Sequence, residues 1–293
     1  MDFKQELKDR VVIVDEYMEK YLPSADKYPE IIHDAMRYSV FAGGKRLRPI
    51  MVMEACKAFG GEWEKAMPFA CAIEMIHTYS LIHDDLPALD NDDYRRGRLT
   101  SHKVYGEDMA ILAGDALLHH AFETMAEACV ELGDVKASKA MLAIAQGAGI
   151  HGMVAGQVVD VISEGKQINK ETLDYIHRNK TAAMLIGSLK SGAYMGGASD
   201  EDIKKLERVG ELVGVAFQVQ DDILDVTSTL EQLGKPINSD EKNNKVTYVT
   251  MFGVERASEI VEEMSNEAID ILKSMENMDF LIKLTEYLIK RDK

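Results

Sequence analysis

Apolar residues recur at helical spacing along almost the whole of this chain, and no other feature constrains the fold as much. Glycine and proline interrupt the pattern at short breaks, alternating β-branched stretches are nearly absent, and there are only six prolines. The sequence therefore predicts an all-α protein of about ten helices. Because no linker or composition shift divides it, we expect a single domain over residues 1–293. The clearest helical segments are 30–41, 66–83, 109–132, 135–162, 170–196 and 200–226.

The charge balance and the cysteines limit the partners and the compartment. A formal net charge of −16 argues against nucleic acid as a partner, because phosphate backbones bind cationic surfaces. Cys56, Cys71 and Cys129 are isolated in apolar helical segments, so we expect free thiols and a reducing compartment. We recognise no signal peptide and no apolar run of about 18 residues. The expectation is a soluble, cytoplasmic protein with no membrane span.

Two aspartate clusters follow apolar helical stretches, DDLPALD at 84–90 and DDILD at 221–225. Carboxylates this dense repel one another unless cations neutralise them. Ligand sets made only of oxygen suit Mg²⁺, which keeps several waters and is often completed by substrate phosphates. The clusters therefore predict a site that holds a phosphorylated substrate through Mg²⁺, with Mn²⁺ as a possible substitute.

The spacing within each cluster predicts its local geometry. Asp221 and Asp225 are four apart, so they lie on one helix face about one turn apart. Taken alone, this pair is equally compatible with a solvated helix face. Asp84 and Asp90 are six apart and would point to different sides of an ideal helix. Pro87 disfavours a helical residue before it, so a helix end there would bring Asp90 back beside Asp84.

Basic residues gather beside glycines. GGKRLRP at 43–49 is a glycine-loosened loop with three cations, and YRRGR at 94–98 directly follows the first aspartate cluster. Lys180-Thr181 and Lys235 flank the second cluster in sequence. Arg and Lys side chains in such loops suit phosphate binding, although a solvated surface charge is the simpler interpretation of any one of them. Acidic metal sites and basic phosphate sites in one helical chain favour the binding interpretation.

These residues together resemble the trans-polyprenyl diphosphate synthases, most closely the bacterial-type farnesyl diphosphate synthases. The resemblance covers nearly the whole chain and rests on motifs in the family's order: GGKRLRP (43–49), EMIHTYSLIHDDLPALDNDDYRRGRLTSH (74–102), GDALL (114–118), GMVAGQVVD (152–160), IHRNKTAA (176–183), FQVQDDILD (217–225) and GKPINSDEKNNKVTY (234–248). Asn238 departs from the glycine that the family often has there. The resemblance implies one large helical bundle of the isoprenoid synthase type with a central cavity between helices.

The resemblance also implies an activity and roles for individual residues. The family condenses isopentenyl diphosphate head to tail with allylic diphosphates such as dimethylallyl and geranyl diphosphate, after the allylic diphosphate ionises. By resemblance, three Mg²⁺ ions bind Asp84, Asp85, Asp90, Asp221 and Asp225. The allylic diphosphate is held by Arg95, Lys180 and Lys235, with Thr181 and Gln218 near the developing cation. Isopentenyl diphosphate is held by Lys45, Arg48, His77 and Arg96. Gly44 and Lys245 complete the substrate-binding set, and Arg291 reaches the site when the C-terminal tail closes.

Product length is expected to depend on Tyr79 and Ser80, five and four residues before Asp84. In the family a bulky residue at the position of Tyr79 tends to floor the tail pocket, which favours farnesyl diphosphate, with geranylgeranyl diphosphate as the alternative. A class I terpene cyclase is less compatible, because it does not explain Lys45, Arg48 and His77. A non-catalytic partner subunit is less compatible because both aspartate clusters are intact. The family leads us to expect a homodimer.

Overall fold

A computed structural model describes residues 2–227 and 246–289, and almost all of this part is helical. The first helices are α1 (Phe3–Tyr21), α2 (Glu30–Val40), α3 (Leu47–Ala58), α4 (Trp63–Asp84), α5 (Ser101–Tyr105) and α6 (Glu107–Leu132). The next are α7 (Val135–Ala148), α8 (Met153–Ser163), α9 (Lys170–Ile176), the π-helix η1 (His177–Ala182), α10 (Ala183–Gly196) and α11 (Asp200–Thr227). The last are α14 (Tyr248–Phe252), α15 (Val254–Lys273) and α16 (Asp279–Ile289).

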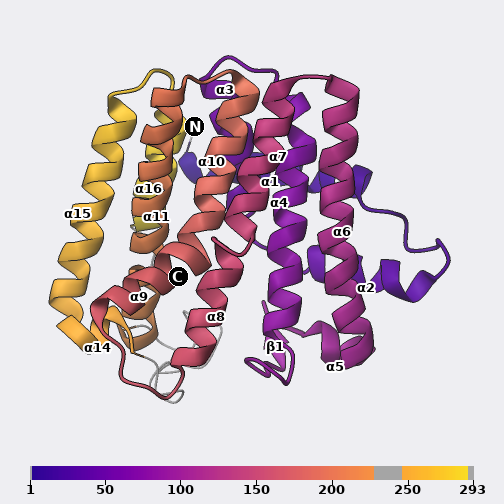
Figure 1. The fold of residues 1–293 in the computed structure, drawn as a ribbon, viewed down its shortest axis with the longest axis horizontal. Helices are drawn as coiled ribbons and strands as arrows, with labels where there is room; N and C mark the ends of the chain where they lie inside the picture. The colour runs from indigo at the N-terminus through magenta and orange to yellow at the C-terminus, as the bar shows by residue number, and fades with distance from the viewer. Residues whose placement is uncertain (1, 228–245, 290–293) are drawn as a thin grey trace.

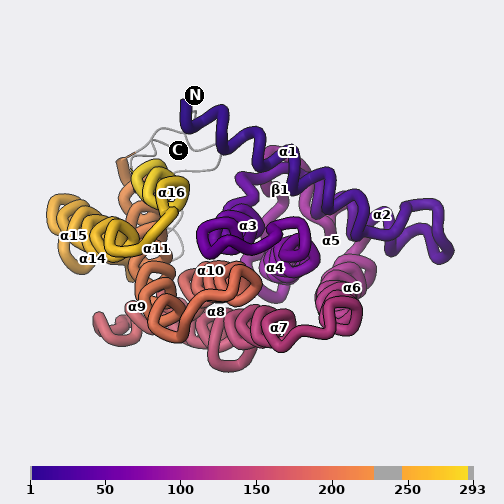
Figure 2. Tube along the Cα trace, turned by 90° about the horizontal axis from the view of Figure 1, so that it is seen from above, coloured from indigo at the N-terminus to yellow at the C-terminus, as the bar shows by residue number. Residues whose placement is uncertain are grey.

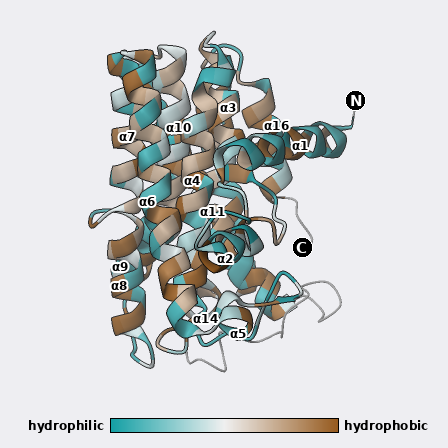
Figure 3. Ribbon diagram, turned by 90° about the vertical axis from the view of Figure 1, so that its right-hand side faces the viewer, coloured by the Kyte–Doolittle hydropathy of each residue, from teal (hydrophilic) through white to brown (hydrophobic). Residues whose placement is uncertain are grey.

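The helices form a bundle in which α3, α4 and α10 are central and the others surround them (Figure 2). Helix α4 is buried on nearly every face, from Ala66 to Ile82, as expected of a helix that is apolar all round. Helix α1 crosses the outside of the bundle and presents mostly hydrophilic residues (Figure 3). The predicted all-α class is confirmed. The strands of the described chain are β1 (Tyr94–Arg95) and β2 (Arg98–Leu99), paired antiparallel in a short hairpin.

Two predicted helices are interrupted. The segment 135–162 is divided into α7 and α8 by a turn in which Gly152 has backbone angles of −128° and −127°, which are not helical. The segment 170–196 continues as α9, η1 and α10, so its middle turns are π-helical. The spacing of apolar residues could not predict either interruption, because each is only a few residues long.

One stretch, Val135–Ser163, is long and apolar enough to span a membrane by length and composition alone. It comprises α7 and α8, and each is shorter than the ~20 residues that a bilayer requires. The three cysteines are free, as predicted; Cys56 and Cys71 are buried and Cys129 is partly buried.

The bundle brings several helix ends together at one end. Helices α4, α8 and α11 all finish near the lower edge of the molecule in Figure 1. Both aspartate clusters lie at or next to such ends, at Asp84 and within the last turns of α11. The fold therefore places at the same end of the bundle two carboxylate clusters that the sequence separates by more than a hundred positions.

Candidate active site

The first aspartate cluster forms a turn that folds back on the end of α4. The amide of Asp90 donates a hydrogen bond to the carbonyl oxygen of Asp84 over 2.9 Å, and the amide of Leu86 donates to the carbonyl of His83 over 3.2 Å. These bonds satisfy carbonyls at the helix end. Asp90 thus returns beside Asp84, as the position of Pro87 predicted.

Asp84 is the electrostatic centre of this turn. Burial raises the pKa of its carboxyl, which the Lys180 ammonium opposes and the Asp90 carboxylate reinforces. The Gln157 side chain donates a hydrogen bond to Asp84 Oδ1, and Lys180 Nζ lies 3.9 Å from Asp84 Oδ2. A buried carboxylate that is only partly neutralised in this way has a strong preference for an additional cation.

Lys180 connects Asp84 to a carboxylate that we did not assign from the sequence, Asp160 on α8. Lys180 Nζ lies 2.7 Å from Asp160 Oδ2. Burial would lower the pKa of Lys180, but Asp84 and Asp160 outweigh it and the pKa is raised. Gln157 was also missed. Both lie inside the quoted GMVAGQVVD motif, three residues apart and hence on one helix face, which was the available signal.

The side chain of Asp85, the next residue, forms an ion pair with Arg95. The Arg95 Nε lies 2.8 Å and 2.9 Å from the two carboxylate oxygens of Asp85, and a second guanidinium nitrogen lies 2.5 Å from Oδ1. Asp85 is only 3% exposed. This fork aligns Arg95 beside the acidic turn. The metal role of Asp85 and the diphosphate role of Arg95 stay predictions.

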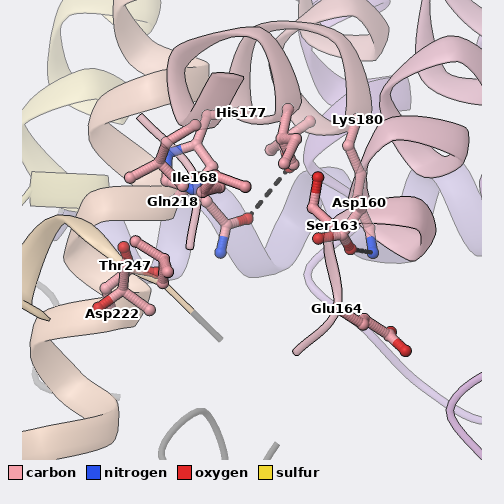
Figure 4. Close-up of a pocket in the computed structure, with 13 residues that line it drawn as sticks. Asp160, Ser163, Glu164, Ile168, His177, Lys180, Gln218, Asp222 and Thr247 are labelled. Atoms are coloured by element: carbon pink, nitrogen blue, oxygen red, sulfur yellow. Dashed lines mark hydrogen bonds and ion pairs between the residues drawn. The ribbon is translucent and has the colours of Figure 1, made fainter. Parts of the chain in front are cut away.

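The π-helix η1 presents Lys180 and Thr181 to the site. Thr181 Oγ1 donates to Gln218 Oε1 on α11 over 3.1 Å, which ties η1 to the helix that carries the second aspartate cluster (Figure 4). Gly156 on α8 allows η1 to approach closely, because a Cβ at this glycine would lie 2.1 Å from the backbone nitrogen of Lys180. π-Helical turns occur often at functional sites, and this one carries two predicted catalytic residues.

A second, basic group lies around Arg48 and His77. Burial and the neighbouring Arg96 lower the pKa of Arg48, and burial with Arg48 holds the pKa of His77 well below its usual range. Arg48 Nε is buried and, among the described residues, finds no hydrogen-bond acceptor. Arg96 donates to the carbonyl of Gly43 and packs on Gly44, where a Cβ would lie 2.8 Å from its guanidinium. Such a cluster fits a bound anion.

Arg46, from the same basic loop, has a different role. Its guanidinium lies 2.8 Å from Asp15 Oδ1 and 3.0 Å from Glu74 Oε1, and it donates to the carbonyl of Val40 over 2.7 Å. The side chain is 1% exposed. Arg46 is therefore a buried structural cation, whereas the neighbouring Lys45 is exposed at the surface.

Two cavities meet at Lys180 and Thr181, which line both. The smaller, of about 120 Å³, is polar and is lined by Asp160, Gln218 and Asp222 among others (Figure 4). The larger, of about 360 Å³, extends from Arg48, His77 and Asp84 past Tyr79 and Ser80 to valines of α8. Its volume lies within the range of ordinary ligand sites, ~300–1,000 Å³. A polar head-group site thus adjoins a mostly apolar cavity.

The second aspartate cluster occupies the end of α11. Asp225 is buried and Asp221 is half-buried, whereas Asp222 accepts a hydrogen bond from the Tyr248 amide over 3.2 Å. Asp222 lines the smaller cavity; Asp221 and Asp225 line neither cavity described above. Lys235, Lys245 and Arg291 lie outside the described residues.

The carboxylates fit magnesium. Asp84 and Asp90 lie beside one another in the turn. The raised pKa of Lys180, caused by Asp84 and Asp160, shows that these carboxylates stabilise a cation placed next to them. Within residues 2–227 and 246–289, no set of three or more His, Cys, Asp or Glu side chains forms a ready-made metal cage. Oxygen donors from one or two carboxylates, completed by water and phosphate, are what Mg²⁺ prefers.

Comparison with known proteins agrees with this geometry. The family model for polyprenyl synthetase matches residues 29–285. A chloroplastic geranylgeranyl pyrophosphate synthase of Catharanthus roseus is 49% identical over 267 residues, covering 90% of this chain and 75% of that protein.

Solved structures extend the comparison to the fold. Geranylgeranyl pyrophosphate synthetase from Pyrococcus horikoshii superposes with a TM-score of 0.89 at 30% identity, covering 99% and 98% of the two chains. A Helicobacter pylori geranyltransferase complexed with magnesium and isoprenyl diphosphate superposes with a TM-score of 0.87 at 30% identity over 99% of each. The bundle is thus of the isoprenoid synthase type, as predicted. The chain belongs to the polyprenyl synthetase family of prenyltransferases.

Proposed function

We propose that this prenyltransferase condenses isopentenyl diphosphate with allylic diphosphates and that its main product is geranylgeranyl diphosphate. The observation that carries the reaction is the meeting of a polar cavity and an apolar cavity at Lys180 and Thr181. The product is suggested by relatives: the proteins from Catharanthus and Pyrococcus are both named for geranylgeranyl diphosphate.

The basic side chains divide between two diphosphates. Arg48, Arg96 and the neutral His77 bind the diphosphate of isopentenyl diphosphate, because Arg48 needs an anion to complete its hydrogen bonds. Lys180 and Arg95, beside the first aspartate cluster, bind the allylic diphosphate and stabilise its charge as it leaves. Asp84 and Asp90, together with the second cluster, would hold Mg²⁺, which would supply Lewis-acid stabilisation of the departing diphosphate.

Lys180 is well placed for this work because it is already charged and oriented. Asp160 holds its ammonium at 2.7 Å, so little reorganisation is needed when charge develops on the leaving group. The Thr181 hydroxyl lies at the junction of the cavities, where the allylic carbons would lie, and donates a hydrogen bond over 3.1 Å to Gln218 in the smaller cavity. The apolar walls of the larger cavity exclude water from the cation.

Farnesyl diphosphate is the second candidate product, and one observation favours it. The Tyr79 ring lines the larger cavity on the helix that carries Asp84, where it limits the depth open to a growing chain. The same ring contacts His83 edge to face, with the ring centroids 5.6 Å apart, which holds it at this wall. A direct product assay distinguishes a fifteen-carbon from a twenty-carbon product.

The test is to incubate the purified protein with isopentenyl diphosphate and each allylic diphosphate in Mg²⁺ buffer, then to chromatograph the dephosphorylated products. Twenty-carbon alcohol as the main product supports the proposal, and fifteen-carbon alcohol supports the second candidate. Cyclic hydrocarbon from a single diphosphate, or no product, would refute prenyl elongation.

EDTA should abolish turnover and added Mg²⁺ or Mn²⁺ should restore it; full activity after chelation contradicts the metal assignment.

We further propose that the protein acts as a homodimer, as the resemblance led us to expect, and that it is cytoplasmic, as the cysteines led us to expect. Three free cysteines accord with a reducing compartment. Size-exclusion chromatography with light scattering tests the dimer: a mass near twice 32.7 kDa supports it, and 32.7 kDa at assay concentration contradicts it.

A further inference from the structure

One wall of the larger cavity is formed by two aromatic rings that contact each other. Tyr79 and His83 lie one turn apart on α4, and both line the cavity. Their rings meet edge to face, with centroids 5.6 Å apart and planes at 82°. His83 Nε2 also lies 3.1 Å from the carbonyl oxygen of Ile111 on α6. The imidazole therefore bridges the Tyr79 ring and the neighbouring helix.

The place of the imidazole depends on a glycine of α6. A Cβ on Gly114 would lie 2.2 Å from His83 Nε2, 2.5 Å from Cδ2 and 3.0 Å from Cε1. The three nearest atoms all belong to one ring, so the space that a side chain at 114 would fill is occupied by His83. Helices α4 and α6 lie side by side in both views (Figures 1 and 2). Gly114 thus provides the recess that holds the imidazole against α6.

A ring expelled from this recess moves away from α6, towards Tyr79, the cavity and the solvent, to which 28% of the His83 side chain is already exposed. On the α6 side the backbone of Ile111 and the carboxylate of Asp115, 4.0 Å from Nε2, limit its movement. On the other side lie Tyr79 and the cavity. A side chain at 114 therefore displaces the imidazole from α6 towards the side on which Tyr79 and the cavity lie.

We propose that Gly114 and His83 are positioning residues for product length: Gly114 seats the imidazole, and the imidazole fixes the Tyr79 ring at the wall of the tail cavity. The inference rests on the proposed function, because it assigns the larger cavity to the growing chain. His83 thereby acts on the product through Tyr79 and through the width of the cavity, without contact with the diphosphates.

Two opposite substitutions test it. Gly114→Ala pushes the imidazole into the cavity and shortens the product by one five-carbon unit. The ratio of the shorter to the wild-type product should rise about tenfold, a ~1.4 kcal/mol change in relative barriers. His83→Ala removes the edge contact that holds Tyr79, so the ring can turn aside and the product lengthens. The double variant removes the clash, because the new methyl group enters the space that the imidazole leaves, and it should not shorten the product.

Gly210→Ala is the matched control. A Cβ there would lie 2.9 Å from Ile186 Cα, so it also overpacks two helices, but away from the cavity. It should lower the melting temperature without changing product length. Products are measured by chromatography of the dephosphorylated alcohols, beside the KM for isopentenyl diphosphate and a thermal melt. A structural role alone would change the melt and leave the product ratio as in the wild type.

The product lengths of these variants decide whether the inference holds. Wild-type product length in Gly114→Ala, or equal shortening in Gly210→Ala or in the double variant, overturns the inference. If Gly114→Ala does not fold, His83→Ala decides: longer products support the inference and an unchanged product overturns it. Failure of the proposed function is a different result, because the wild-type protein itself would then yield no elongated product.

Discussion

Arg46 and Arg48 lie two residues apart in the same basic loop, and their substitution should have opposite consequences. Arg46→Met removes a guanidinium that contacts Asp15 at 2.8 Å and Glu74 at 3.0 Å. Glu74, with 3% of its side chain exposed, would remain as a buried anion without this partner. Arg48→Met removes a cation whose buried Nε has no acceptor among the described residues.

The magnitudes follow from these contacts. Breaking a buried ion pair by removing one partner costs ~3–5 kcal/mol. At roughly 2–4 °C per kcal/mol for a large domain, Arg46→Met should lower the melting temperature by about 6–20 °C. Arg48→Met should leave the melting temperature unchanged or raise it, since burial lowers the pKa of Arg48 and so disfavours its charge. A lost hydrogen bond to a charged diphosphate is worth ~1.5–3 kcal/mol, which raises the KM for isopentenyl diphosphate about 10–150-fold.

The assay combines thermal melts with steady-state kinetics in which each substrate is varied separately. Neutralising Glu74 should recover part of the lost stability. The double variant Arg46→Met with Glu74→Gln should therefore have a higher melting temperature than Arg46→Met alone. The KM for the allylic substrate serves as the internal control and should change little in Arg48→Met. The reasoning is refuted if Arg48→Met is the unstable variant, or if Arg46→Met changes the KM for isopentenyl diphosphate without a change in melting temperature.

Three further substitutions address the rest of the site. In Gly156→Ala, the new Cβ would lie 2.1 Å from the backbone nitrogen of Lys180, which is 1.3 Å short of the 3.4 Å of ordinary contact. Because Lys180 must shift, kcat should fall about 10²-fold, whereas the KM for isopentenyl diphosphate should not change. A variant with the wild-type kcat contradicts this. Burial raises the pKa of Asp84 in the folded protein. The folded protein therefore loses stability as the pH rises through that pKa and the buried carboxyl ionises. Asp84→Asn should therefore raise the melting temperature of the metal-free protein at pH 7 while abolishing turnover, and a lower melting temperature would count against it. Tyr79→Ala should lengthen the product by one isoprene unit; destabilisation by ~3 kcal/mol with unchanged product length would show a packing role only.

The helices and the turn at Asp84 could be predicted because their causes are local. Apolar spacing determines which face of each helix is buried, and Pro87 ends α4 within a few residues of the carboxylates that it separates. The separate roles of Arg46 and Arg48 could not be predicted. Asp15 and Glu74, which bind Arg46, are 31 and 28 positions away in sequence, and nothing in GGKRLRP distinguishes the two arginines. Which cation is structural depends on contacts that exist only once α1, α3 and α4 have packed.

The placement of Lys180 and Thr181 was beyond prediction for a related reason. The six residues of η1, HRNKTA, contain one alanine and no larger apolar side chain, so apolar spacing cannot distinguish a π turn from an α turn there. The turn is instead shaped by two close approaches: a Cβ at Gly156 would lie 2.1 Å from Lys180 N, and one at Gly214 would lie 2.4 Å from Ala182 Cα. These glycines lie on α8 and α11, on either side of η1 in the packing. The orientation of the Lys180 ammonium towards Asp84 and Asp160 is thus a property of how three helices pack, and substitutions at either glycine should alter catalysis more than substitutions at exposed positions of η1 itself.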